Sequence, residues 1–177
     1  MRYLIVVALL ALPIDAHAKG DDETSPPKTT KTTKQCLGVR VWDSAKKRCV
    51  RPKQSELNDD LLYDAVRELA YAGRYLDAQG VMDAMADQAS DRVLTYRGFT
   101  ARKLGDLSLA NVHYEMAISL NPDNIAARSY MGQGFVEAGD KVAALMQLRE
   151  IQARGGQGTW AEVSLRQAIE TGTGYNY

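Results

Sequence analysis

Residues 90–124 read SDRVLTYRGFTARKLGDLSLANVHYEMAISLNPDN, and this stretch decides the fold. Small and apolar side chains recur every three or four residues on both sides of Gly105, a spacing that places them on one face of an α-helix. These positions are Leu94, Gly98, Ala101, Leu109, Ala110, Tyr114, Ala117 and Ile118. Pro122 ends the second half, because proline has no N–H with which to continue a helix. The stretch therefore predicts two helices joined by a tight turn at Gly105.

The small residues occupy the positions where two such helices would meet. Gly98 and Ala110 would allow two antiparallel helices to approach closely. Tyr114 and Ala117 would face the next helix, and Pro122 would turn the chain into the next unit. This order of small, small, aromatic, alanine and proline resembles the tetratricopeptide repeat (TPR). The resemblance implies a solenoid of helix pairs whose activity is to hold another molecule.

The same turn recurs along the chain. A glycine followed five residues later by an alanine occurs at Gly73, Gly105 and Gly139, which lie 32 and 34 residues apart. The family period is about 34 residues, and a degenerate first unit is expected because a terminal repeat has one neighbour only. We expect an all-α, TPR-type solenoid of about three helix pairs; the alternative is an ordinary helical bundle with chance spacing. The expected domain is 55–171, with repeats at about 59–90, 91–124 and 125–158.

A further helix is expected after the third pair. Residues 159–162 read TWAE and match a capping box, in which threonine and glutamate each accept a free backbone N–H. The helix at 159–171 resembles the one that closes many TPR arrays. The tail at 172–177 is expected to fray, and the alternative is that Tyr175 and Tyr177 dock into a groove.

The N-terminus predicts export. Residues 1–18 read MRYLIVVALLALPIDAHA, with one basic residue before about twelve largely apolar ones and a small-x-small ending at Ala18. The apolar run is too short for an ordinary membrane span, and no other stretch is apolar enough to cross a bilayer. We therefore expect cleavage after Ala18 and a periplasmic or secreted chain with no transmembrane span, the alternative being a retained N-terminal anchor.

Residues 19–35 form a Lys/Thr/Pro-rich linker in this interpretation. They read KGDDETSPPKTTKTTKQ and contain no aliphatic or aromatic side chain. Such a segment cannot offset the entropy cost of folding, so we expect it to be disordered. It would act as a solvated linker or, alternatively, as a charge-seeking arm.

Residues 36–53 are expected to form a small hairpin. The chain has two cysteines, Cys36 and Cys49, and export would place them in an oxidising compartment, where they would pair. The alternation around Val41 and the Asp43-Ser44 turn predict two short strands. Closing a loop of this size stabilises by about 3 kcal/mol in the chain-entropy model.

Trp42 lies in the pattern C-x-G-x-x-x-W-D-x-x-x-x-x-C, which is similar to one hairpin of the peritrophin-type chitin-binding modules. That resemblance implies a glycan contact for Trp42. The glycan contact is the alternative: we expect Trp42 to pack on the first helix as a cap for the repeats.

Charge divides the chain into two halves. Residues 19–53 carry ten Lys/Arg and four Asp/Glu, whereas residues 54–177 carry eleven and seventeen. A basic arm beside an acidic helical domain could fold back on it or reach an anionic partner, such as a cell-wall polymer or a lipid headgroup. The compartment and the acidic repeats disfavour nucleic acid.

The sequence offers little for catalysis. After the predicted cleavage site one histidine remains, His113, inside a predicted helix, and both cysteines would be consumed by the disulfide. Asp83 and Asp87 share a helix face but lack a third ligand, so they make a weak metal site. We therefore expect no enzyme activity, no metal and no cofactor.

The TPR resemblance implies a peptide-binding groove lined by the first helix of each pair. The positions that it assigns are Tyr63, Arg67, Tyr71, Arg92, Thr95, Phe99, Arg102, Lys103, Ser129, Gln133 and Glu137. Tyr63 and Phe99 are expected to supply apolar anchors, and the arginines and Lys103 a basic centre. The sequence lacks the asparagines of the family's carboxylate clamp, which argues against capture of a chain-terminal carboxylate.

Two functions follow from the sequence. The first is a non-enzymatic, protein-binding adaptor of the bacterial cell envelope that holds a partner segment in the groove. The alternative is an envelope glycan or peptidoglycan binder, in which Trp42 and the basic hairpin make contact and the repeats are scaffold.

Overall fold

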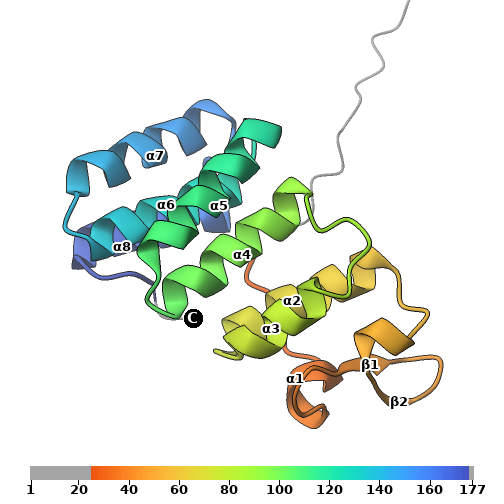
Figure 1. Cartoon of the computed structure of the whole chain (residues 1–177). Coiled ribbons are helices and arrows are strands. Elements are labelled where there is room, and N and C mark those ends of the chain that lie inside the picture. The colour runs from red at the N-terminus through yellow and green to blue at the C-terminus, as the bar shows by residue number, and fades with distance from the viewer. Residues whose placement is uncertain (1–24, 176–177) are drawn as a thin grey trace, which may run out of the picture.

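The computed structural model describes residues 25–175, so the predicted signal sequence at 1–18, the start of the linker and the last two residues lie outside it. The chain is mostly helical, with one small hairpin near its N-terminal end (Figure 1). The elements are α1 (Lys31–Gln35), β1 (Val41–Asp43), β2 (Arg48–Val50), the short 3-10 helix η1 (Pro52–Gln54), α2 (Asp59–Tyr71), α3 (Tyr75–Met82), α4 (Asp91–Lys103), α5 (Leu107–Leu120), α6 (Ile125–Glu137), α7 (Lys141–Ala153) and α8 (Trp160–Thr171).

The helices pack in consecutive pairs. Helix α2 packs on α3, α4 on α5 and α6 on α7, and the first members α2, α4 and α6 contact one another in that order. Helix α8 packs against both α6 and α7 and closes the far end, away from the hairpin (Figure 1). None of the helices between residues 25 and 175 combines the length and the apolar character that a membrane span requires.

A left-handed glycine ends the first helix of each pair. Gly73, Gly105 and Gly139 have φ angles of 74°, 94° and 82°, a conformation that side-chain-bearing residues rarely adopt. After Gly105 the N–H of Asp106 donates to the carbonyl of Ala101 at 3.0 Å, and equivalent bonds follow Gly73 and Gly139. The sequence pattern of break glycines therefore corresponds to three similar helix-ending turns.

Two of these turns also begin the next helix. The carboxylate of Asp106 accepts the N–H of Leu109, and that of Asp140 accepts the N–H of Ala143, each at 2.9 Å. A side-chain acceptor at this position satisfies a backbone donor that has no partner within the helix. Gly-Asp therefore acts as a combined stop and start signal between paired helices.

The hairpin is confirmed. Strands β1 and β2 are antiparallel with Trp42 opposite Cys49, and Cys36 and Cys49 form the predicted disulfide. Val39 packs against Gly80 of α3, where an added Cβ would lie 2.6 Å from the valine side chain. The missing side chain at position 80 thus lets the hairpin segment approach α3.

The end of the predicted linker is ordered, contrary to expectation. Residues 31–35 form α1, capped by Thr30, whose hydroxyl accepts the N–H of Thr32 at 3.1 Å. The buried carboxylate of Glu68 accepts the backbone N–H groups of Thr30 and Thr33 at 2.6 and 3.0 Å and also both threonine hydroxyls. A segment without apolar side chains is therefore held by polar contacts to α2.

The tail also departs from the expectation of fraying. Gly172, with φ of 74°, ends α8 and redirects the chain. Tyr175 then lies against Trp160, with ring centroids 5.0 Å apart and planes at 84°. The alternative of a docked tyrosine is therefore the arrangement found for Tyr175, while Tyr177 lies outside the described residues.

Candidate binding surfaces

The eleven residues expected to line a groove gather on one side of the stacked first helices. They lie on α2 (Tyr63, Arg67, Tyr71), on α4 (Arg92, Thr95, Phe99, Arg102, Lys103) and on α6 (Ser129, Gln133, Glu137). We call the side that they define the α2–α4–α6 face. Contacts between helices link them, such as the stacked rings of Tyr71 and Phe99 at 5.7 Å. The structure therefore brings the predicted set together.

Most of this set is buried, so the expectation of exposed apolar anchors is wrong. Tyr63 and Phe99 are 1% and 0% exposed, because both are packed in a cluster of aromatic rings that includes Tyr96 and Tyr130. Thr95, Ser129 and Gln133 are completely buried, and Arg67 and Arg102 nearly so. Tyr71, Arg92 and Lys103 are half-buried.

The arginines on this face are engaged in ion pairs. The guanidinium of Arg102, whose side chain is fully buried, lies 2.5 Å from the carboxylate of Glu137. Arg92 pairs with Asp60 at 2.8 Å and lies over the ring of Tyr63. The expected basic centre is therefore largely neutralised by neighbouring carboxylates.

Lys103 lies beside the Arg102–Glu137 pair. Burial lowers the pKa of Lys103, the positive charge of Arg102 lowers it further, and Glu137 acts in the opposite direction. Its ammonium nevertheless has a main-chain partner, the carbonyl of Tyr175, at 2.8 Å.

Two segments of the chain itself, neither of them helix or strand at the contact, lie on the α2–α4–α6 face. From the N-terminal side, the carbonyl of Ser25 accepts a hydrogen bond from Arg67 at 3.4 Å. From the C-terminal side, the N–H of Tyr175 donates to the Gln133 side chain at 3.3 Å, and the Tyr175 carbonyl is the partner of Lys103. The side chains of this face thus bind peptide main chain.

An aromatic hollow of about 300 Å³ lies where these two segments meet. Its lining residues are Pro26, Pro27, Thr29, Glu68, Tyr71, Ala72, Trp160 and Tyr175. The indole N–H of Trp160 donates to the Tyr71 hydroxyl at 3.0 Å, and that hydroxyl is 2.7 Å from the hydroxyl of Tyr130. These bonds fix the orientation of the Trp160 and Tyr71 rings, so the hollow has preformed aromatic walls. Trp160 does not belong to the set of residues that the TPR resemblance assigned to the groove.

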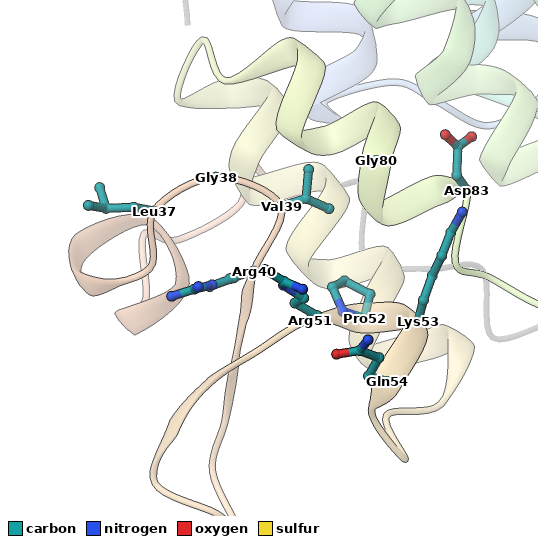
Figure 2. Close-up of a pocket in the computed structure, with 10 residues that line it drawn as sticks. All are labelled: Leu37, Gly38, Val39, Arg40, Arg51, Pro52, Lys53, Gln54, Gly80 and Asp83. Atoms are coloured by element: carbon teal, nitrogen blue, oxygen red, sulfur yellow. The ribbon is translucent and has the colours of Figure 1, made fainter.

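A larger hollow of about 680 Å³ lies between the hairpin segments and α3 (Figure 2). Leu37, Val39 and Pro52 supply apolar surface, and Leu37 is 82% exposed. Three cations, those of Arg40, Arg51 and Lys53, surround this surface, and the carboxylate of Asp83 lies at its edge (Figure 2). The net positive charge around an apolar floor suits an anionic ligand.

Trp42, the alternative glycan contact, is half-buried. The ammonium of Lys31 lies 4.5 Å from the centre of its ring, so a cation already occupies one face of the indole. A hollow of about 390 Å³ separates this region from α2 and includes Leu61 and Ala65 in its walls. Trp42 therefore offers a partly covered surface.

Exposed apolar side chains also lie along the outer helices α5 and α7. The sequence pattern did not predict that they would be exposed. On α5 they are Leu109, Val112, Met116 and Leu120, and on α7 they are Val142, Leu145 and Met146. The α5 residues recur at spacings of three and four, so they form one stripe along the helix. The signal was present in the sequence, but the repeat pattern had assigned this helix to packing.

Within residues 25–175, no three or more His, Cys, Asp and Glu side chains are placed to share a metal ion. Burial lowers the pKa of His113, and the positive charge of Arg97 lowers it further, so the imidazole is neutral at pH 7.

Comparison of this chain with protein-family models, with curated proteins and with solved structures gives no match. The function of this chain is therefore inferred from the surfaces of the molecule itself.

Proposed function

We propose that this chain is a TPR-type helical-repeat protein of the cell envelope, exported by its N-terminal signal, whose α2–α4–α6 face holds an extended segment of a partner protein. Three helix pairs with similar Gly-turns and a closing helix support the repeat interpretation. The function proposed is binding, without catalysis or a cofactor.

One observation carries this proposal: the face already binds main chain from distant segments of the same protein. Arg67, Lys103 and Gln133 all contact main-chain atoms of segments far away in the sequence. Main-chain contacts give affinity for any extended peptide in the correct position, and neighbouring side-chain pockets then select among sequences. The three residues belong to the set that the TPR resemblance assigned to partner binding.

A photo-crosslinking experiment tests the proposal. A photoreactive phenylalanine analogue replaces the half-buried Tyr71 on the face, and in a control chain it replaces Met146, which is 58% exposed on α7. Each full-length chain is irradiated in the exporting cell, and crosslinked peptides are identified by mass spectrometry. We expect position 71 to capture a short segment of another envelope protein that position 146 does not capture. Capture from position 146 alone would place the partner on the outer helices and overturn the proposal.

A second candidate function is binding of an anionic envelope polymer through the hairpin region. The cations of Arg40, Arg51 and Lys53 around the larger hollow favour it (Figure 2). Sedimentation with purified cell wall tests it: charge reversal at these three positions should abolish sedimentation, whereas Lys141→Glu on α7 should not.

A further inference from the structure

The docked C-terminal segment indicates which ligand the α2–α4–α6 face selects. We propose, on the basis of the peptide-holding function above, that this face recognises an extended segment with a glycine followed by an aromatic residue. The chain's own Gly174 and Tyr175 are the resident occupant, which a partner segment of the same chemistry displaces.

Trp160 recognises the aromatic residue of the bound segment. The ring of Tyr175 meets the indole edge-to-face at a centroid distance of 5.0 Å, the geometry that the charge distribution of aromatic rings favours. The indole is held by its hydrogen bond to Tyr71. Since the receiving ring is already oriented, little side-chain freedom is lost when an aromatic ligand binds.

Glu137 and Arg102 restrict the preceding position of the bound segment to glycine. A Cβ added to Gly174 would overlap the Glu137 carboxylate and lie 3.1 Å from the Arg102 guanidinium. A free glutamate could swing away, but this carboxylate is paired with Arg102, whose side chain has no exposed surface. Any side chain in place of Gly174 would therefore have to displace Glu137, the ion-pair partner of the buried Arg102.

Two main-chain contacts of Tyr175 set the register of the segment on the face. Lys103 donates to the carbonyl of Tyr175, and Gln133, completely buried, accepts the Tyr175 N–H. Both contacts are independent of the ligand's side chains. They place an extended chain so that one residue faces Glu137 and the next faces Trp160, and this makes a Gly-aromatic pair the recognised unit.

The resident segment is suited to displacement. Among the residues after Gly172 that the structure describes, Thr173 is exposed, and Gly174 and Tyr175 are half-buried. A tethered segment competes at a high effective concentration, of the order of millimolar for short linkers. A site that the tail covers about 90% of the time binds an external ligand about tenfold more weakly than an open site.

The test measures a defined peptide binding to the full-length chain and its Tyr175→Ala variant. The probe is a fluorescein-labelled, C-terminally amidated peptide of sequence TGTGYNY, which corresponds to residues 171–177, and the readout is fluorescence anisotropy. We expect Tyr175→Ala to bind it about tenfold more tightly than the unaltered chain, because the resident segment has lost its aromatic contact. Thr173→Ala, at an exposed position, should bind like the unaltered chain.

Two altered peptides test the recognised unit. Against the Tyr175→Ala chain, TGTLYNY and TGTGANY should each bind at least about tenfold more weakly than TGTGYNY, a loss that corresponds to one contact or one steric conflict. Equal binding of the leucine peptide, or no binding of TGTGYNY to either chain, would overturn the proposal. If crosslinking at position 71 still captures a partner segment in that case, only the ligand class is wrong; if it captures none, the proposed function fails as well.

Discussion

The ring of Tyr114 on α5 lies directly against the α-carbon of Gly98 on α4. A Cβ built at position 98 would be 2.5 Å from the ring atom Cε1, and Tyr114 is completely buried, so the ring has no free space to enter. Gly132 on α6 has a similar relation to Leu165 of α8, at 2.7 Å. The distance between these helices is thus set by the absence of a side chain.

This relationship predicts that Gly98→Ala destabilises the chain. Overpacking a closed contact typically costs about 1–3 kcal/mol, which exceeds the helix-propensity gain of alanine over glycine, about 0.5–1 kcal/mol. In a Tyr114→Ala background the obstacle is absent, so the same substitution should stabilise by about 0.5–1 kcal/mol. Urea unfolding of the four chains gives the comparison. Equal effects of Gly98→Ala in both backgrounds would show that the ring does not limit the approach.

The hydrogen bonds between Glu68 and the start of α1 predict that α1 detaches locally from α2 when the carboxylate is lost. Glu68→Gln replaces an oxygen acceptor by an NH₂ group facing the donors of Thr30 and Thr33, although the side chain keeps its shape. Trypsin should then cleave after Lys31 and Lys34 about tenfold faster, because cleavage follows the population of the locally open state. Early fragments are measured by mass spectrometry.

The control for this release is Glu56→Gln, whose side chain is 93% exposed. It should leave the rate of tryptic cleavage in residues 30–35 unchanged. If both variants are cleaved at the rate of the unaltered chain, the four hydrogen bonds to Glu68 do not hold α1 in place.

The disulfide predicts a loss of stability on reduction. Closing a loop of this length contributes about 3 kcal/mol, and reduction should lower the free energy of unfolding by about that amount. Cys36 is 1% exposed and neighbours the Val39–Gly80 contact, so the first helix pair should lose amide-exchange protection before the others. Urea unfolding with and without a thiol reductant measures the loss, and the Cys36→Ser/Cys49→Ser chain should be insensitive to the reductant. An unchanged midpoint on reduction would contradict the prediction.

Local signals in the sequence account for the helix pairs and the disulfide. Gly105 followed by Asp106 specifies a left-handed helix end and a new N-cap within two residues, so neither depends on distant parts of the chain. Two cysteines permit a single intramolecular bridge. These features could be predicted because their causes lie within a few residues of their effects.

The order of residues 30–35 could not be predicted in the same way. Its cause is Glu68, which lies 35 residues or more along the chain, and the segment itself has no hydrophobic pattern. Contacts between distant polar groups leave no periodic signal in a single sequence.

The residues of the α2–α4–α6 face also combine features that a local pattern predicts with features that depend on distant contacts. The TPR resemblance assigned Tyr71, Phe99 and Lys103 to one side of the first helices, and they lie on α2 and α4, where the rings of Tyr71 and Phe99 stack. Which of them is accessible depends on how rings from successive helices stack, and Phe99 lies inside that stack. Charge reversal at Arg102 would change the stability of the fold, because the Arg102 side chain is buried beside Glu137.

Glu162 predicts how stability depends on pH. Its buried carboxylate accepts hydrogen bonds from the Gln152 side chain and from the Gly158 N–H, and these, with a smaller contribution from Arg166, hold its pKa below the ordinary value of 4.5. A lowered folded-state pKa stabilises the fold above pH 4.5, and this contribution disappears as the pH falls through the folded-state pKa. Glu162→Gln should therefore cost about 1.5–3 kcal/mol at pH 7, the range for hydrogen bonds to a charged group, and should flatten the loss of stability below pH 4.5. Urea unfolding from pH 3 to pH 7 measures both effects, with the exposed Glu170→Gln on the same helix as control. If the two variants lose stability in parallel with the unaltered chain, the hydrogen bonds to Glu162 do not favour its charged form.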